Sequence, residues 1–411
     1  RILWVLYKTS LSKNIAKGSL NTPAHSQTVY DIASESIVLL KNDKHMLPLN
    51  TTGIKTIAVI GDNATHTNHS GGFGAGVKAK YEITPLQGLK NALGKTVQIN
   101  FAQGYIAHVE KPWEKKKENV DVNQPDTALI EQAVNTAKNS DIAIVFIGGN
   151  RDYESESRDR KDLSLPFGEQ ALVDAVTAAN ANTIVVVIDG APYDINKIKK
   201  DNHTIVWSWF NGSESGHALA DVLTGKINPS GKLPFTFPVA LDESPAFYLH
   251  TFPGENLTTD YKEGILVGYR WYDTKNIAPL YPFGYGLSYT EFKYSGIKTD
   301  KKDYKNNDNI IVTAKVKNTG KHAGKETVEL YIGKPNSAVE RAEKELKAFK
   351  KVMVAAGKEV TVTLRVPVKS LAYYDEAKSK WVVEPGDYNL MVGKSSRDIE
   401  AKETINIAVG N

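Results

Sequence analysis

In the first half of the chain, continuous apolar runs alternate with segments whose apolar residues recur at helical spacing. A run that is apolar on both faces is typical of a parallel strand covered by helices on each side. Such runs lie at 56–61, 141–147, 183–189 and 204–209, and helices are expected at 29–40, 85–93, 128–137, 169–181 and 216–223. The pattern predicts an α/β domain with a mostly parallel sheet between helices.

After residue 289 the period changes to two, which is the period of a half-buried strand. Apolar residues alternate with polar ones within 310–316, 360–366, 388–392 and 405–409. Turn signals separate these stretches, namely Asn318-Thr-Gly320, Ala356-Gly357 and Pro385-Gly-Asp387. Several short alternating strands in about 110 residues predict an antiparallel β-sandwich. It carries no evident catalytic cluster, so we expect a packing role for it.

Between these regions, residues 242–288 are dense in Gly, Pro, Tyr and Phe. Flexible linkers are poor in aromatic residues, so this segment is expected to pack against its neighbours. The expected division is therefore a short leading segment at 1–27, an α/β domain at 28–241, the aromatic linker at 242–288 and the sandwich at 289–411. The leading stretch Arg1–Lys8 has the pattern of the end of a helix rather than of a signal peptide.

Composition narrows the function classes. The formal charge of +4 over 411 residues is small and well mixed, so neither nucleic acid nor an acidic membrane surface is indicated as a partner. No apolar run is long enough to cross a bilayer. The chain has no cysteine, which excludes disulfides, thiol nucleophiles and cysteine metal sites.

The richest candidate chemistry lies in the polar loop 149–166, directly after the apolar run 141–147. Ligands of α/β proteins bind at the carboxyl ends of strands, and a carboxyl group there can both donate and accept a proton. Glu154 and Glu156 are two apart, so in an extended loop they share a side. The alternative is that both are solvated charges paired with arginines, and the sequence favours neither reading. Those arginines are Arg151, Arg158 and Arg160.

A second loop, Ser70-Gly-Gly-Phe-Gly-Ala-Gly76, follows the first strand. Such a loop can hold a phosphate, but its spacing misses the nucleotide-binding fingerprints. It can also bring the backbone close to a sugar, with Phe73 as an aromatic platform. The simpler alternative is that Phe73 is a loop aromatic that packs into the core.

Two further features have simpler explanations. His66 and His69 are three apart and near Asp62, but nothing supplies a third ligand, so no metal site is expected. Asp189, at a strand end, is a candidate acid. Its expected role is to cap the turn at Gly190-Ala-Pro192.

Several segments together resemble glycoside hydrolase family 3, the β-glucosidases and β-xylosidases, over nearly the whole chain. The matching segments are 33–42 with 47–49, 83–89, 156–160 with 163–166, 212–238, and 282–289. In order, they are similar to the family's entry into its second domain, the stretch after its Gly-rich loop, its acid/base loop, its most characteristic signature and its entry into a fibronectin type III-like domain.

The resemblance implies a retaining mechanism with two carboxyl groups and no metal or organic cofactor. By position in the motif the acid/base is Glu156, with Glu154 as the fallback, and Phe73 and Arg160 are expected to contact substrate. The other group, an aspartate nucleophile, belongs in this family to an N-terminal (β/α)8 barrel that is missing here. Arg1–Lys8 is similar to the last helix of that barrel.

The resemblance therefore implies part of an exo-acting β-glucosidase that removes terminal β-D-glucosyl residues from oligosaccharides. The expected partners are that substrate and the barrel, in the same protein or a companion chain, and a homodimer is left open. A β-xylosidase and a non-catalytic carbohydrate-binding remnant are the alternatives, and a nucleotide-binding protein rests only on the Gly-rich loop. The family's polysaccharide-degrading members imply a periplasmic or secreted location.

Overall fold

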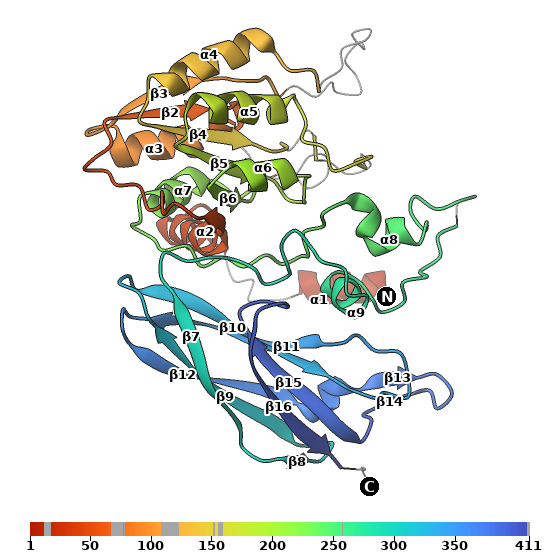
Figure 1. Ribbon diagram of the computed structural model, residues 1–411. Helices are drawn as coiled ribbons and strands as arrows, with labels where there is room; N and C mark the ends of the chain where they lie inside the picture. Colours follow the sequence, from red (N-terminus) through yellow and green to blue (C-terminus); the bar gives the residue numbers. More distant parts are fainter. Residues whose placement is uncertain are drawn as a thin grey trace.

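The computed structural model describes residues 1–11, 18–66, 77, 79–107, 123–150, 153–154, 159–256 and 258–408. Figure 1 shows an α/β domain above a β-sandwich, with the segment around α8 and α9 beside the junction of the two. This arrangement confirms the predicted fold class.

The α/β domain is built on one six-stranded sheet with the order β1-β6-β5-β4-β2-β3. Only β1 runs antiparallel, with Val38 paired to Trp207 of β6, and the other neighbours are parallel. The central strands β4 and β5 are buried along their whole length, as their apolar runs predict. The strands are β1 (Val38–Asn42), β2 (Thr56–Ile60), β3 (Gln98–Ala102), β4 (Ile142–Ile147), β5 (Thr183–Ile188) and β6 (Thr204–Ser208).

Helices cover both faces of this sheet. Residues of α4 (Thr127–Lys138), α5 (Glu169–Ala179) and α6 (Asn196–Asp201) join the core on one face. Residues of α2 (Pro23–Ser36), α3 (Pro85–Leu93) and α7 (Ser215–Leu223) join the core on the other. A short 3-10 helix, η1 (Asp62–Ala64), follows β2. Two apolar clusters thus cover the two faces of the sheet, and the loops after its strands lie at the edge between them.

The prediction of one helix over 29–40 is wrong. Helix α2 ends at Ser36, and β1 begins at Val38. Val38 and Leu40 belong to one core cluster, whereas Ile37 and Leu39 belong to the other. The residues therefore alternate with the period of a strand, but both faces are apolar and the alternation is invisible in the sequence.

The C-terminal region packs a five-stranded sheet, β11-β10-β15-β16-β8, against a three-stranded one, β12-β9-β7. The predicted strands correspond to β9, β12, β15 and β16, although Val409 lies outside the described residues. The strands are β7 (Phe292–Thr299), β8 (Asp303–Tyr304), β9 (Asn309–Asn318), β10 (Gly324–Gly333), β11 (Glu345–Val354), β12 (Glu359–Pro367), β15 (Gly386–Gly393) and β16 (Ile399–Ile407). A 3-10 helix, η4 (Val368–Leu371), and a hairpin of β13 (Tyr373–Asp375) and β14 (Lys380–Val382) complete it.

The aromatic segment between the two regions is packed against both. It contains a 3-10 helix, η3 (Leu241–Glu243), and the short helices α8 (Pro245–Tyr248) and α9 (Tyr269–Thr274). Trp271 and Tyr272 are buried, and Tyr269 packs against Tyr331 of β10. On the other side, Leu287 forms a β-bridge with Leu39 of the large sheet. The segment therefore connects the two regions, through aromatic side chains towards the sandwich and through a β-bridge towards the α/β domain.

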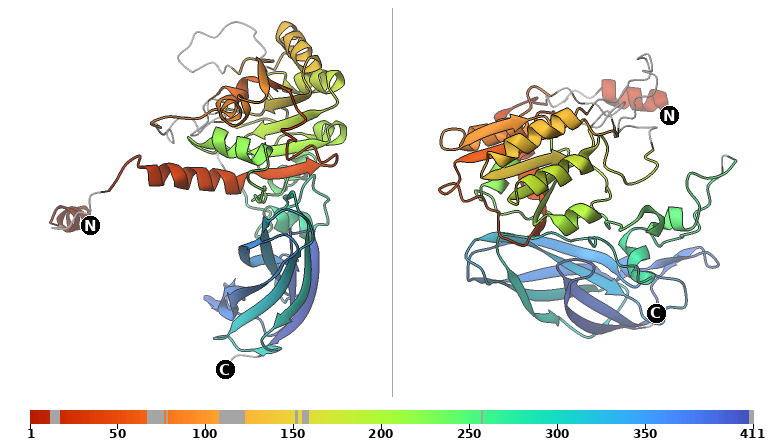
Figure 2. Two further views of the ribbon diagram at one scale, coloured as in Figure 1. Left: turned by 90° about the vertical axis from the view of Figure 1, so that its left-hand side faces the viewer. Right: turned by 45° about the horizontal axis from the view of Figure 1, so that its top comes forward.

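Helix α1 (Ile2–Ser10) lies apart from the rest, beyond the far end of the projecting α2 (Figure 2). None of its residues is buried, although its sequence is largely apolar. Across the described residues, no helix combines the length and the apolar character that crossing a bilayer requires.

Candidate active site

The candidate site lies where β4 and β5 end, side by side in the sheet. Carboxyl ends of parallel strands meet at one edge, so the loops after them come together there. Gly148 has a φ of +116°, and a Cβ added to it would lie 2.2 Å from the carbonyl oxygen of Ile188. Glycine at this position therefore lets the start of the loop after β4 run against the end of β5.

Asn150 holds the beginning of the loop. Its main-chain oxygen accepts from the N–H groups of Tyr153 (3.1 Å) and Glu154 (2.8 Å), and its side-chain Oδ1 also accepts from Tyr153 (2.9 Å). The Tyr153 ring packs edge-on against Phe167, with ring centroids 5.5 Å apart. These contacts turn the chain back on itself and direct Glu154 towards the end of β5.

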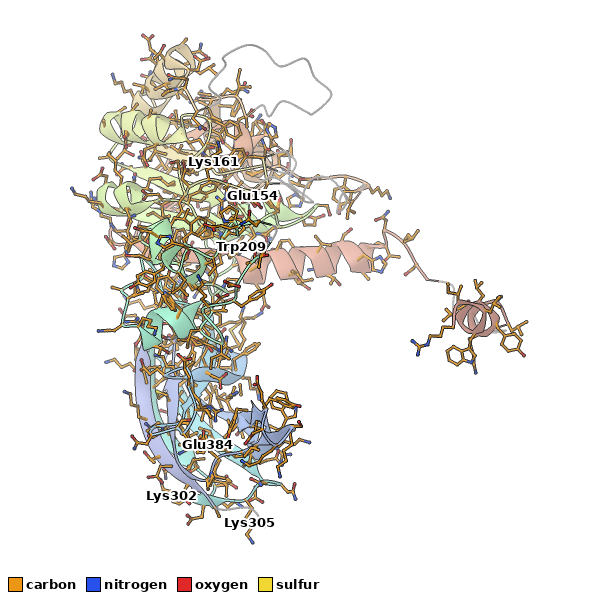
Figure 3. The ribbon with its side chains drawn as sticks, turned by 90° about the vertical axis from the view of Figure 1, so that its right-hand side faces the viewer. Glu154, Lys161, Trp209, Lys302, Lys305 and Glu384 are labelled. Atoms are coloured by element: carbon orange, nitrogen blue, oxygen red, sulfur yellow. The ribbon has the colours of Figure 1, made fainter. Side chains whose placement is uncertain are left out.

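Glu154 is mostly buried, with 19% of its side chain exposed. Burial raises the pKa of its carboxyl to about 8, and the charge and hydrogen bond of Asp189 add to that shift. Arg160, whose Nη2 lies 3.7 Å from Oε1, and the N–H of Gly190 act in the opposite direction. The pairing with Arg160 is thus found, but the alternative of a solvated charge is wrong for Glu154. Figure 3 shows Glu154 on the side of the α/β domain from which α2 projects.

Asp189 is fully buried directly after β5. Its Oδ1 accepts from the N–H of Ala191 at 2.9 Å, which confirms the predicted turn cap. Its Oδ2 accepts from the N–H of Gly149 at 2.6 Å. Asp189 thus accepts two backbone hydrogen bonds, and the raised pKa of Glu154 places the proton of the pair on Glu154 at neutral pH.

Arg160 closes the same cluster from the other end of the loop. Its guanidinium carbon lies 4.4 Å from the centre of the Tyr193 ring, in a cation–π arrangement. Its Nη1 is buried and has no hydrogen-bond partner among the residues that the structure describes. The described contacts of Arg160 are therefore with the protein, and its expected contact with substrate stays a prediction.

A third buried carboxyl, which the sequence did not single out, contacts the start of the loop. Glu169, at the first position of α5, accepts from the N–H of Gly148 through both oxygens at 3.0 Å. Burial raises the pKa of this carboxyl well above its ordinary value. The sequence does show an acidic residue at a helix N-terminus, where the helix dipole favours a negative charge. That pattern is also common on solvent-exposed helices, so it does not identify Glu169 as buried.

The other predicted site residues are placed only in part. Glu156, Phe73 and His69 lie outside the described residues. His66 lies 3.2 Å from Asp62, whose carboxylate also accepts from the N–H of Ala107. Within the described ranges, no three His, Asp or Glu side chains come together as a metal site would require.

A cavity of about 1190 Å³ lies elsewhere, between α2, α3 and α7. Its polar lining is internally bonded: His217 Nδ1 lies 2.7 Å from Glu214, and the hydroxyl of Tyr81 donates to Ser26. No described residue of the 149–166 loop lines it. The size of this cavity is therefore no evidence that Glu154 or Arg160 acts in it.

Known proteins identify the family. The sequence pattern of the glycosyl hydrolase family 3 C-terminal domain matches residues 37–289, more than half of the chain, and that of a fibronectin type III-like domain matches residues 326–396. The chain belongs to glycoside hydrolase family 3.

Its relatives in the family are longer proteins. It is 40% identical over 407 residues to thermostable β-glucosidase B of Acetivibrio thermocellus, covering 99% of this chain and 51% of that protein. It is 39% identical to β-glucosidase BoGH3A of Bacteroides ovatus, covering 98% of this chain and 54% of that protein. The family 3 chain thus spans about half the length of these relatives.

The fold agrees with solved family structures. The β-glucosidase of Bifidobacterium adolescentis superposes with a TM-score of 0.87 at 35% identity, covering 99% of this chain and 56% of that one. DesR, a β-glucosidase of Streptomyces venezuelae in complex with D-glucose, gives 0.88 at 28% identity, covering 99% and 63%. The loop that holds Glu154 and Arg160 lies within the matched family 3 domain.

Proposed function

We propose that this chain supplies the general acid/base of a retaining, exo-acting β-glucosidase, and that the group is Glu156. The supporting observation is the position of the loop: it belongs to a family 3 domain and follows a buried strand at the ligand-binding edge of the sheet. The β-glucosidases among the relatives favour glucosides as substrates.

Glu156 is proposed over Glu154 because the carboxyl of Glu154 is already engaged. It lies against Asp189, the N–H of Gly190 and the guanidinium of Arg160. An acid/base must reach the glycosidic oxygen and then a water molecule, so a carboxyl held by protein groups is poorly suited to it. The motif position points to the same choice.

The chemistry takes two steps. An aspartate nucleophile attacks the anomeric carbon while Glu156 gives its proton to the departing glycosidic oxygen, so the bond between sugar and aglycone breaks as the bond to the aspartate forms. Glu156, now ionised, then takes a proton from water. The resulting oxygen nucleophile displaces the aspartate and releases glucose. No metal or organic cofactor is used.

The nucleophile must come from a (β/α)8 barrel that acts together with this chain, in the same protein or as a companion. A retaining site needs its two carboxyl groups about 5 Å apart across the sugar. The proposal therefore requires the barrel to lie against the edge where β4 and β5 end. Phe73 and Arg160 are the proposed substrate contacts on this side.

We also propose a periplasmic location, because a relative from Salmonella typhimurium is named a periplasmic β-glucosidase.

Hydrolysis of three p-nitrophenyl glycosides tests this function: the β-D-glucoside, the β-D-xyloside and the α-L-arabinopyranoside. The last two are included because a β-xylosidase and exo-α-(1→6)-L-arabinopyranosidases are also relatives. With the barrel present, we expect the glucoside to have the highest kcat/KM, and this chain alone to be inactive. Preference for the xyloside would give a β-xylosidase, and a folded, barrel-containing protein inert on all three would indicate a carbohydrate-binding remnant.

A further inference from the structure

Beyond the acid/base itself, the geometry points to a device that holds it. We propose that Glu154 and Asp189 form a carboxyl pair that shares one proton and, with Arg160, fixes both ends of the acid/base loop. Glu154 is then a positioning residue that acts through the loop and not on the substrate. This inference rests on the proposed function of Glu156.

The pair joins two strands of the sheet. Asp189 follows β5, and Glu154 lies in the loop after β4. A Cβ added to Gly149 would lie 2.5 Å from Oδ2 of Asp189 and 3.4 Å from Cγ of Glu154, and one added to Gly190 would lie 3.0 Å from Oε2 of Glu154. The two acids thus fill the space between these glycines and leave no room for a larger residue at either.

Both ends of the segment 155–158 are held by the same cluster. Glu154 precedes that segment, and its N–H is bonded to Asn150. Arg160 follows it, stacks on Tyr193 and lies 3.7 Å from Glu154. Further along, the N–H of Asp194 donates to the carbonyl oxygen of Leu163 at 2.6 Å. The loop is therefore anchored at each end to the turn after β5.

Among the residues that the structure describes, the charged and titratable groups that act on Glu154 are Asp189 and Tyr193 from the turn after β5, and Arg160 from its own loop. With a proton on Glu154, the single negative charge of the carboxyl pair is balanced by the positive charge of Arg160. If Glu154 loses its proton, two buried carboxylates face each other beside Arg160, and their repulsion pushes the loop away from the turn. Loop order should therefore fail at alkaline pH.

The sign of the effect on stability follows from the raised pKa of Glu154. In the unfolded chain this carboxyl titrates near 4.5, and in the folded chain near 8. Between these values only the folded state holds the proton, so the contribution of Glu154 to stability is complete below pH 4.5 and is lost as the pH rises through 8.

The Glu154→Gln variant tests the proposed positioning role, because glutamine keeps a hydrogen-bond donor for Asp189 but cannot titrate. The first readout needs no activity: the 13Cδ signals of labelled glutamate in this chain, recorded from pH 4 to 10. One signal should titrate near pH 8 and be missing in Glu154→Gln but present in Glu131→Gln, a control at an exposed site of α4. Titration of the Glu154 signal near 4.5 would overturn the inference even if the enzyme proved inactive.

The second readout is the pH profile of kcat/KM in the barrel-containing protein. If the wild type loses activity as Glu154 ionises, Glu154→Gln should be active at pH 7 and should avoid a roughly tenfold loss between pH 7 and pH 9. Asp189→Asn removes the second carboxylate, so it too should reduce the alkaline loss, and it carries the test if the glutamine variant does not fold. An unchanged alkaline limb in both variants would overturn the inference. So would a Glu154→Gln enzyme that is inactive until azide is added, because Glu154 would then be the acid/base.

Discussion

At the scale of single residues, Asp273 of α9 is a buried charge that links the aromatic segment to the sandwich. Its Oδ2 lies 2.9 Å from Nζ of Lys344, and only 2% of the aspartate and 5% of the lysine side chain are exposed. Arg397 reaches the other oxygen and also donates to the carbonyl oxygens of Tyr272 and Ile277 at 2.9 Å. Such a pair is costly to break from one side, because the partner charge stays buried.

Asp273→Asn should therefore destabilise the protein by about 3–5 kcal/mol, since the amide keeps the volume but leaves buried Lys344 with only the exposed carboxylate of Glu343, 3.4 Å away, as a counter-charge. Urea unfolding monitored by tryptophan fluorescence measures the change. Asp260→Asn, at an exposed position of the same segment, is the matched control and should shift stability by no more than about 0.5 kcal/mol. Equal stability of the two variants would show that the cluster does not hold the segment.

The carboxyl pair shows what residue patterns can and cannot predict. The sequence places Glu154 and Glu156 after a buried strand, and that position is confirmed for Glu154. It does not distinguish a solvated glutamate from a buried one, because the deciding partner, Asp189, comes from the next strand of the sheet. Its turn cap to Ala191 was predictable because it is local, whereas its contact with Glu154 depends on strand order.

At the scale of elements, α3 and α7 approach so closely that backbone touches backbone. A Cβ added to Gly88 of α3 would lie 2.0 Å from the carbonyl oxygen of Gly216, and one added to Gly216 would lie 2.1 Å from that of Thr84. The N–H of Gly216 also donates to Ile83 at 2.9 Å. The two glycines therefore set the distance between helices that cover one face of the large sheet.

This contact reverses the expected sign of Gly88→Ala. Helix propensity alone would make alanine stabilising by about 1 kcal/mol. The clash with Gly216 should instead make it destabilising by about 1–3 kcal/mol. Denaturant midpoints measure the difference, with Gly18→Ala as control because no described atom lies within 4 Å of its Cβ position. A more stable Gly88→Ala protein would contradict the close approach.

Strands were predictable where apolar and polar residues alternate, and where a continuous apolar run is rich in β-branched residues as in β4 and β5. They were missed where a buried strand shows neither pattern. Strands β9, β12, β15 and β16 alternate visibly, and their prediction is confirmed. Strand β10 was missed because its inward face carries Val328 and Leu330, while its other face buries Glu329 and Tyr331 beneath the aromatic segment. Strand β1 was mistaken for helix for a related reason, since both of its faces are apolar.

At the scale of the whole molecule, this chain combines a family 3 α/β domain with a fibronectin type III-like sandwich and spans about half the length of its relatives. The described part contains buried carboxyls at the strand ends but no barrel with a second catalytic acid. In our account, catalysis therefore belongs to an assembly in which this chain provides proton transfer and a barrel provides the nucleophile.

The rate of Glu156→Gln in the barrel-containing protein, on cellobiose and on 2,4-dinitrophenyl β-D-glucoside, tests that account most directly. Cellobiose needs a proton on its leaving group, so its kcat/KM should fall by about 10²- to 10⁴-fold. The dinitrophenyl glucoside leaves without that proton and should lose far less in the first step, and azide should restore turnover by replacing activated water. If Glu156→Gln hydrolyses cellobiose as fast as the wild type, Glu156 is not the acid/base and the account is wrong.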